Sequence, residues 1–537
     1  MGGITPYEAP RASPWSPITI PTYAKASVGH PPVCEIRRSM WTHSRNNSTQ
    51  SCAFLHGQGR GLMRRRMKKS FPVHGIFGIL FLILSEIFLL KKIEPFYSWF
   101  YCFAWWSYIF TIDGIIYWLK GNSLIVNRRK EFLLMVPWSV FIWLIFEAAN
   151  LLLNNWYYIN LPHSILERWL GYAIAYGTVL PGLFETVELL ETLGLFKNSQ
   201  TRKPEISSRR HSLLALLGAF CLISSVLISE YFFPLVWVGF ILLLEPFNYR
   251  FGGRSLLRDL EEGSPTHLYS LLTAGLICGL LWEFWNFWAR SKWIYTVPFF
   301  EEAKGFEMPF LGFFGFLPFA VQAYVIYNFI SLFRFKRGWD VSTYNLHTDH
   351  KTRSLTSVLI TVLMVSFFVL MFQAIDLKTV DSYYPRLKDA YWIEPGHRAD
   401  LPRAGIASLE DLVEKTRNKT EREEWALRLL VPKEEFIPWI EKAQLVLLKG
   451  MGIENLRLLE RVGVSSVSAL ALQDPKKLQE RMNQVFHGRS VPRLAKIRIW
   501  IKEARKKSPL SPLSQRKDGG NSNVVFTFFP SMQQINP

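Results

Sequence analysis

The chain has 537 residues, of which 49% are hydrophobic and 15% aromatic, and its formal net charge is +19. This length leaves room for several domains and argues against one compact soluble core. The sequence contains no Walker A loop, Rossmann fingerprint, HExxH motif or nucleophile elbow, which disfavours an ATP-driven pump and a hydrolase of the soluble type. The five cysteines show no CxxC or other metal-ligand spacing, so neither a cysteine-based metal site nor a disulfide framework is expected.

The first 62 residues contain scattered proline, serine and glycine without a sustained periodicity, and they lack the apolar core of a secretory signal. A start typical of a membrane protein appears at Met63-Arg-Arg-Arg-Met67-Lys-Lys, just before the first apolar run. Two interpretations of residues 1–62 stay open. They form a disordered tail, or they are a mis-annotated extension upstream of a translation start at Met63 or Met67.

Between about Phe71 and Ile375 the chain is a series of long apolar runs, and charged residues crowd the remainder. A helix needs roughly 20 apolar residues to cross a bilayer, and soluble cores rarely supply that length repeatedly. We therefore predict an all-α fold, a polytopic membrane helical bundle with a small soluble domain after it. About nine spans are predicted, near residues 72–90, 96–119, 132–153, 169–193, 212–229, 231–248, 267–289, 309–333 and 354–375.

Basic residues indicate the orientation of the spans. They gather at residues 64–69, 128–130, 202–210, 250–258 and 334–353. Such clusters are typical of cytoplasmic loops, whereas the aromatic residues of the opposite loops, 154–168 and 290–308, favour a place at headgroup level. The pattern predicts a multi-pass protein of the plasma membrane with a cytoplasmic N-terminus. Nine crossings would put the C-terminal domain outside the cytoplasm, and one miscounted span would reverse that.

Three motifs recur in the same order, which predicts an internal duplication. Asp113-x3-Tyr117-x3-Gly121-x-Ser123-Leu124 matches Glu245-x3-Tyr249-x3-Gly253-x-Ser255-Leu256 at a constant offset. Glu147-x2-Asn150-x11-Pro162 matches Glu283-x2-Asn286-x11-Pro298, and Pro181-x3-Glu185 matches Pro318-x3-Gln322, at nearly the same offset. The predicted repeats are residues 63–193 and 194–333, with four spans each, followed by a loop and a ninth span in 334–376. An even number of spans per copy implies a parallel pseudo-twofold axis along the membrane normal.

Acidic side chains inside the predicted spans are the candidate functional residues, because an ionisable group in hydrocarbon costs roughly 2.5–3.5 kcal/mol on insertion scales. Residues i and i+3 share a helix face, so Glu147 with Asn150, and Glu283 with Asn286, form two polar patches. Asp113, Glu245 and Glu185 complete the predicted intramembrane site. One interpretation is a polar, aromatic-walled cavity between the repeats, and the other is that each carboxyl is hydrogen-bonded and only fixes helix packing.

The C-terminal region, residues 377–507, has a different character, with short amphipathic helices separated by Gly- or Pro-marked turns. Ala404-Gly405-Ile406-x-Ser408-Leu409 matches Val462-Gly463-Val464-x-Ser466-Val467, and Leu448-Lys-Gly450-Met-Gly452-Ile453 resembles the helix-hairpin-helix motif. Over residues 392–507 the region resembles tandem helix-hairpin-helix domains of unknown function. That resemblance implies an anion-binding turn at Gly450 and Gly452. The second of the two copies, residues 447–507, has 14 basic and 5 acidic residues and is therefore strongly basic. Residues 508–537 are predicted to be disordered.

Three functions follow as hypotheses. The bundle binds or moves a small solute, ion or lipid; or it is a membrane enzyme on an isoprenoid-like lipid, with paired carboxyls as general acid and base; or it anchors the C-terminal domain for a protein partner. The repeated spans with intramembrane acids are similar to those of small membrane carotenoid cyclases, whose paired-acid motif after proline is absent here. The sequence leaves open whether there is a catalytic residue or a cofactor. The lipid bilayer is the predicted partner, and nucleic acid is disfavoured because an extracytoplasmic domain would not meet it.

Overall fold

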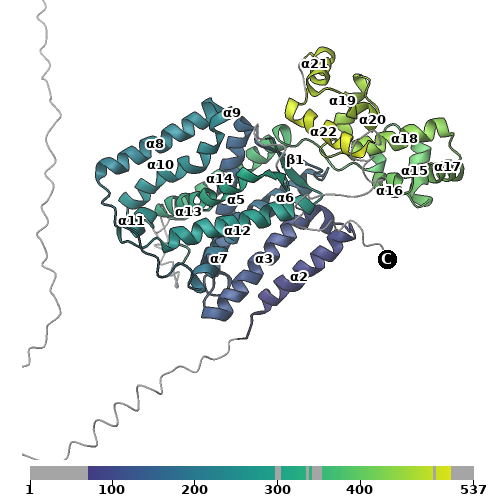
Figure 1. Ribbon diagram of the computed structural model, residues 1–537. Coiled ribbons are helices and arrows are strands. Elements are labelled where there is room, and N and C mark those ends of the chain that lie inside the picture. Colours follow the sequence, from purple (N-terminus) through teal and green to yellow (C-terminus); the bar gives the residue numbers. More distant parts are fainter. Residues whose placement is uncertain (1–69, 297–303, 334–337, 341–352, 488–490, 509–537) are drawn as a thin grey trace, which may run out of the picture. The chain divides into compact units, whose positions relative to one another are not determined.

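The computed structural model describes residues 70–296, 304–333, 338–340, 353–487 and 491–508, and the described chain is mostly helical (Figure 1). The predicted terminal tails, the start at Met63 or Met67, Pro298 and most of the basic loop at 334–353 lie outside these residues. Of the bundle, the helices are α2 (Val73–Leu90), α3 (Phe96–Lys120), α4 (Leu124–Asn127), α5 (Arg129–Leu153), α6 (Ile165–Tyr176), α7 (Val179–Thr192), α8 (Ser208–Leu227), α9 (Ser229–Phe232), η1 (Phe233–Leu235), α10 (Val236–Arg250), α11 (Leu256–Glu261), α12 (Thr266–Trp288), η2 (Phe310–Gly315), α13 (Phe316–Leu332) and α14 (Arg353–Lys378).

Seven helical segments of the described chain are long and apolar enough to cross a membrane, which confirms the expectation of membrane-length helices. They are Val73–Leu90, Arg129–Leu153, Ile165–Thr192, Ser208–Leu227, Thr266–Trp288, Phe310–Leu332 and Ser357–Lys378. The other two predicted spans coincide with α3, whose many tryptophans and tyrosines lower its hydropathy, and with α10, which has 15 residues. The count of nine spans therefore stays a prediction.

The outer faces of the bundle are apolar. Leu80 and Leu90 on α2, Leu216 and Phe220 on α8, and Leu370 on α14 are each more than 60% exposed. Meanwhile Asp113, Glu147, Glu185 and Glu283 are completely buried. Large contiguous apolar surfaces are rare on soluble monomers, so these faces suit contact with hydrocarbon.

A feature that the sequence did not predict is a short antiparallel ribbon. Strand β1 (Trp156–Ile159) pairs with β2 (Lys292–Tyr295), with Tyr157 opposite Ile294. A second pair joins β3 (Lys304–Gly305) to β4 (Met308–Pro309). The expectation of headgroup contact is wrong for β1, because Trp156, Tyr157 and Tyr158 are buried, with exposures of 8%, 3% and 7%. The fold is thus a helical bundle with almost no sheet, but the sheet that it has lies against the predicted site.

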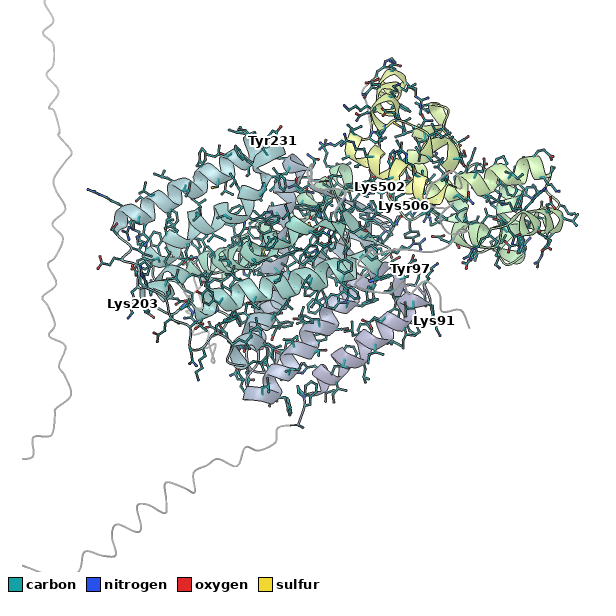
Figure 2. The ribbon with its side chains drawn as sticks, viewed as in Figure 1. Lys91, Tyr97, Lys203, Tyr231, Lys502 and Lys506 are labelled. Carbon is teal, nitrogen blue, oxygen red and sulfur yellow. The ribbon has the colours of Figure 1, made fainter. Side chains whose placement is uncertain are left out.

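The C-terminal region forms its own hydrophobic core around Leu401, Trp439, Leu456 and Trp500, all of them 2% exposed or less. Ser408, Asn418, Ser466 and Asp474 cap helices here by accepting backbone N–H bonds, as the sequence pattern favours. The elements are η3 (Leu387–Asp389), α15 (Pro395–Arg403), α16 (Leu409–Glu414), α17 (Lys419–Arg428), α18 (Lys433–Val446), α19 (Gly452–Arg461), α20 (Val467–Ala471), α21 (Pro475–Phe486) and α22 (Leu494–Lys507). Figure 2 shows the side chains of Lys502 and Lys506 on α22.

An ion pair fastens the end of α14 to α6. The guanidinium of Arg168, only 5% exposed, donates to both oxygens of Asp376 at 3.0 and 2.7 Å. Trp169 Nε1 and the Tyr172 hydroxyl donate to the same carboxylate at 3.0 and 2.9 Å. Four donors satisfy both carboxylate oxygens, so the buried charge is well compensated.

Asp376→Asn is expected to destabilise the protein by about 3 kcal/mol, because it leaves the charge of Arg168 buried without its partner. Thermal unfolding of the purified protein in detergent measures the loss. Asp400→Asn is the matched control, since Asp400 pairs with Arg403 where both side chains are more than half exposed. Equal melting temperatures of the two variants would contradict an anchoring role for Asp376.

Candidate functional site

Glu147 and Asn150 lie on one buried face of α5, and both face β1. The Asn150 side chain donates to the Trp156 carbonyl at 2.9 Å, and its oxygen accepts from the Asn155 and Trp156 backbone N–H groups. One oxygen of Glu147 accepts from Trp143 at 3.0 Å, Trp156 at 3.1 Å and the Tyr158 hydroxyl at 2.5 Å. The other oxygen of Glu147 is buried and has no hydrogen-bond partner in the described chain. Asn150 therefore holds the strand, and Glu147 holds its aromatic side chains.

Glu283 and Asn286 on α12 make a similar arrangement with β2. The Asn286 side chain donates to the Trp293 carbonyl at 3.0 Å and accepts from the Trp293 N–H at 3.1 Å. The Tyr295 hydroxyl donates to Glu283 at 2.8 Å, and the other Glu283 oxygen has no partner among the described residues. Because β1 and β2 pair with each other, the ribbon joins the two predicted patches.

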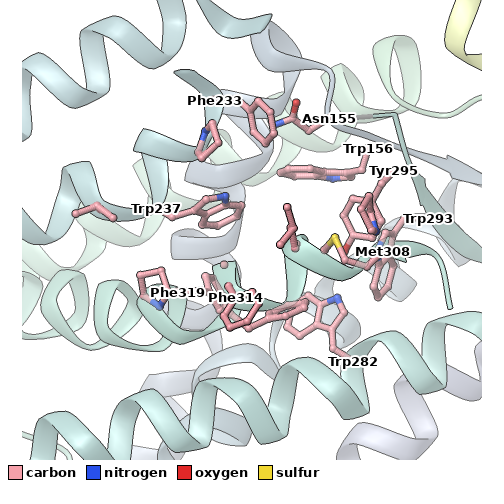
Figure 3. A pocket seen from close by; sticks show the side chains of 18 of the residues that line it. Asn155, Trp156, Phe233, Trp237, Trp282, Trp293, Tyr295, Met308, Phe314 and Phe319 are labelled. Carbon is pink, nitrogen blue, oxygen red and sulfur yellow. The ribbon is translucent and has the colours of Figure 1, made fainter. Parts of the chain in front are cut away.

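A cavity of about 450 Å³ opens beside the ribbon (Figure 3). The acids do not line it, but Trp156 and Tyr158, which bond Glu147, and Tyr295, which bonds Glu283, do. Among the described residues, the rest of the wall is almost entirely apolar. It consists of Trp143, Asn155, Tyr231, Phe233, Pro234, Trp237, Val238, Trp282, Trp293, Met308, Pro309, Leu311, Gly312, Phe314, Gly315, Phe316, Pro318 and Phe319.

The cavity has a buried floor and an exposed apolar rim. Trp156, Trp282 and Phe319 are only 8%, 6% and 4% exposed. Tyr231 and Phe314, in contrast, are 60% and 69% exposed. Since the rim belongs to segments with apolar outer faces, the mouth is surrounded by surface that suits lipid. The size falls within the range typical of small-molecule pockets.

A second cavity of about 90 Å³ lies on the other side of a shared wall. Trp143, Tyr158, Trp282 and Trp293 line both cavities. Trp99, Tyr101, Cys102, Gly171, Tyr172, Ala175, Tyr176, Arg168 and Lys292 are among the residues that line the smaller one alone. Phe372 of α14 packs against the rings of Tyr172 and Tyr176, so the ninth predicted span covers residues of this side.

Asp113 and Glu245 accept hydrogen bonds from the first residues of two short helices, α4 and α11, and neither acid lines either of the two cavities. Asp113 accepts from the Ser123 hydroxyl at 2.8 Å and the Ile125 N–H at 2.7 Å, and His74 lies 2.8 Å away. Glu245 accepts from the Ser255 hydroxyl at 2.7 Å and the Leu257 N–H at 3.1 Å. These contacts give both acids a packing role at the start of α4 and of α11.

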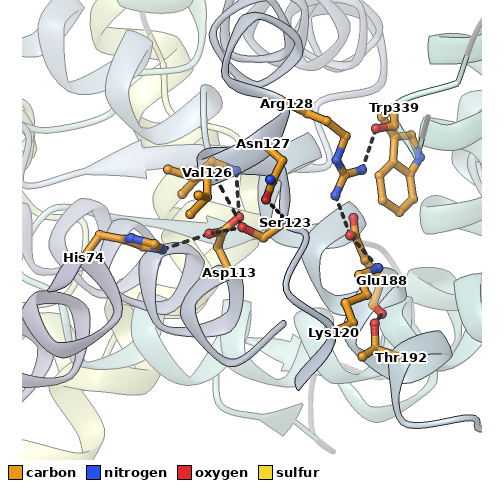
Figure 4. Close-up of polar contacts among 11 residues, drawn as sticks. His74, Asp113, Lys120, Ser123, Val126, Asn127, Arg128, Glu188, Thr192 and Trp339 are labelled. Carbon is orange, nitrogen blue, oxygen red and sulfur yellow. Dashed lines mark hydrogen bonds and ion pairs between the residues drawn. The ribbon is translucent and has the colours of Figure 1, made fainter. Parts of the chain in front are cut away.

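Glu185 is buried beside Asp113, and neither of its oxygens accepts a well-formed hydrogen bond from the described residues. One turn further along α7, Glu188 pairs with Arg128 and, at 2.8 Å, with Lys120 (Figure 4). Arg128 also donates to the Trp339 carbonyl at 2.7 Å. The predicted site residues therefore fall into two groups. The Glu147 and Glu283 patches meet at the ribbon, whereas Asp113, Glu185 and Glu245 bond no residue of it.

Gly450 and Gly452, the glycines of the predicted hairpin, lie close to β1 and to the segment after α14. A β-carbon added at Gly450 would lie 3.4 Å from Ile159 of β1, and one at Gly452 would lie 2.6 Å from Ser382. Asn455 donates to the carbonyls of Asp381 and Gly450, both at 3.3 Å. The segment after α14 itself pairs with β1, through bridges of Tyr158 with Val380 and Leu161 with Tyr383. The glycine turn at 450–452, predicted from the sequence to bind an anion, is thus covered by the protein's own chain.

Charged contacts reinforce this docking. Glu307, 1% exposed, pairs with Lys449 of the hairpin and, at 3.4 Å, with Lys292 of β2. Burial by itself would raise the pKa of Glu307, but the two ammonium groups outweigh it and hold the pKa below its ordinary value. Lys496 of α22 pairs with Asp381 and lies 4.6 Å from the centre of the Tyr157 ring.

Gly452→Ala is expected to destabilise the protein more than Gly463→Ala. Both glycines have positive φ, 65° and 78°, so each substitution carries a similar left-handed strain of about 1–2 kcal/mol. Only Gly452 meets Ser382, whereas a β-carbon at Gly463 would meet no described atom within 4 Å. Chemical denaturation followed by tryptophan fluorescence gives the difference. Equal losses would mean that the hairpin does not depend on its contact with Ser382.

Glu307→Gln is expected to flatten the acid limb of the stability profile. A carboxyl whose folded pKa is lowered contributes stability above its unfolded pKa, near the ordinary glutamate value of 4.5, and loses it as the pH falls through the folded pKa. Melting temperatures between pH 7 and pH 3 should fall less steeply below 4.5 in Glu307→Gln than in the unmodified protein. Parallel profiles would contradict the paired state of Glu307.

Comparison with known proteins bears on the C-terminal region alone. Neither the curated proteins nor the solved structures contain a match to the chain. Residues 392–507 match a domain of unknown function, DUF4332, over the same range in which the sequence predicts a C-terminal domain of unknown function.

Proposed function

We propose that this protein is a multi-pass membrane protein whose bundle binds a small lipid-soluble molecule in the large cavity. The observation that carries the proposal is an aromatic-walled cavity of about 450 Å³ whose rim is apolar and exposed. Apolar pockets with a few convergent polar groups are the usual form of small-molecule sites. A membrane-facing mouth admits a molecule dissolved in lipid without passage through water.

We further propose that the bundle arose by internal duplication. Under the offset that aligns Pro181 with Pro318, Trp156 corresponds to Trp293 and Tyr158 to Tyr295, and each pairs with the counterpart of the other. The pairing register of the two strands is therefore the same after they are exchanged, as a twofold axis through the ribbon requires. Under the same offset, Gly171, Tyr172 and Ala175 of the smaller cavity correspond to Met308, Pro309 and Gly312 of the larger one. Under the offset that aligns Asp113 with Glu245, Trp99, Tyr101 and Cys102 of the smaller cavity correspond to Tyr231, Phe233 and Pro234 of the larger one.

The C-terminal domain is proposed to serve contacts with protein or with the membrane surface. Its hairpin is occupied by the bundle, which disfavours nucleic acid as its partner, and its basic residues suit acidic protein surfaces or anionic headgroups. With nine spans and a cytoplasmic N-terminus in the plasma membrane, this domain would lie outside the cytoplasm. A reporter fused after residue 507, active on one side of the membrane only, tests that orientation.

A membrane enzyme on an isoprenoid-like lipid is the second candidate. The tyrosines that bond Glu147 and Glu283, Tyr158 and Tyr295, line the large cavity, so each tyrosine–carboxyl pair could pass a proton to an occupant. Glu283→Gln separates the two functions. An enzyme would lose turnover and keep binding, whereas a binding protein would show no turnover in either form.

Gly315→Leu is expected to reduce ligand capacity strongly, because the new side chain fills the cavity without strain. Gly315 lines the cavity, and a β-carbon there would meet no described atom within 4 Å. The measurement is the amount of lipid-soluble material that organic extraction and mass spectrometry recover from the purified protein, relative to empty nanodiscs.

Two matched variants accompany it. Gly396→Leu makes the same change in the C-terminal domain, again with no described atom within 4 Å, and Gly171→Leu makes it at the smaller cavity. Both are expected to retain the extracted material. If Gly315→Leu also retains it, the large cavity is not the binding site, and the scaffold function becomes the better account.

A further inference from the structure

Asn155 is a polar side chain in the wall of the large cavity, and none of the described residues hydrogen-bonds its amide group. It is 7% exposed. Figure 3 shows it at the cavity, near Phe233. Buried amides are nearly always bonded, so a free one facing an empty space points to a missing partner.

The backbone holds Asn155 in place. Its N–H donates to the Asn150 side chain at 2.8 Å, and its carbonyl accepts from the Thr296 N–H at 2.8 Å. These bonds tie the residue to both the α5 patch and the end of β2. The backbone of Asn155 is therefore fixed beside the cavity before any ligand arrives, so only the side-chain torsions remain to be ordered on binding.

The described wall of the cavity disfavours one large class of ligand, the charged molecules. No lysine, arginine, histidine, aspartate or glutamate of the described chain lines the cavity. A charged headgroup would leave water or the lipid surface without a counter-charge from the described wall residues, which is costly in an apolar site. An amide, in contrast, can donate to a carbonyl or hydroxyl and can accept from a hydroxyl.

We propose that the cavity takes a neutral lipid-like molecule with one hydrogen-bonding end, a hydroxyl or carbonyl, and that Asn155 selects it by bonding that end. This inference rests on the proposed ligand-binding function and names its ligand class. The apolar body lies against Trp282, Phe316 and Phe319, and the polar end lies at the start of β1.

The test compares four probes with similar chains, namely farnesol, farnesene, farnesoate and farnesylamine. The full chain is reconstituted in phosphatidylcholine nanodiscs, and binding is measured by displacement of tritiated farnesol, with empty nanodiscs subtracted. Farnesol is expected to bind more tightly than the hydrocarbon and than either charged probe. In Asn155→Leu its affinity should fall about three- to tenfold, the value of one hydrogen bond, while that of farnesene stays within about twofold.

Two variants control the result. Asn483→Leu makes the same substitution at an exposed position of α21 and should leave all affinities unchanged. Asn155→Thr keeps a hydroxyl and should keep most of the preference for farnesol, which guards against a folding defect of the leucine variant.

Each outcome has a distinct meaning. If no probe binds above empty nanodiscs, the proposed ligand-binding function itself fails. If farnesol and farnesene bind alike, or if Asn155→Leu leaves their ratio unchanged, the role of Asn155 is overturned while the binding function stands. Preference for farnesoate or farnesylamine would overturn the neutral ligand class.

Discussion

The hydrogen bonds between the paired α5 and α12 side chains and the β1–β2 ribbon are the interactions on which the arrangement depends. Asn150 and Asn286 each bind a backbone segment near the start of a strand, at distances between 2.8 and 3.2 Å. Because unsatisfied peptide groups are costly in an apolar environment, an irregular segment can lie among such long apolar helices only with such partners. These hydrogen bonds place the aromatic side chains of both strands, and these side chains divide the interior into two cavities.

The same ribbon connects the bundle to the C-terminal region. Ile159 and Ile294 form a small buried cluster with Tyr157 and with Ile499 of α22, and the chain after α14 bridges to β1. The large cavity and the docked hairpin thus share one short element. Glu307, which pairs with Lys449, directly precedes Met308 and Pro309 of the cavity wall. A shift of Lys449 would therefore displace this part of the wall.

The sequence was sufficient to predict the helices of the bundle and the helix face on which the polar residues lie. Apolar run lengths located the helices, and the spacing of Glu147 and Asn150 was enough to put them on one face. The β1–β2 ribbon was not predicted, because such short strands form only when a partner from a distant part of the sequence is brought beside them. The alternation of Trp156 and Tyr158, repeated in Trp293 and Tyr295, was the available signal. The site prediction took the acids as cavity groups, whereas in the fold their aromatic partners line the space.

The exposed apolar rim at Tyr231, Leu311 and Phe314 has a thermodynamic consequence. A molecule that enters sideways from the hydrophobic phase exchanges one apolar environment for another, so dehydration contributes little to its affinity. Occupancy then follows the mole fraction of the compound in the surrounding leaflet rather than its aqueous concentration. Shape, ring contacts and a single directional bond are left to discriminate among membrane-dissolved candidates.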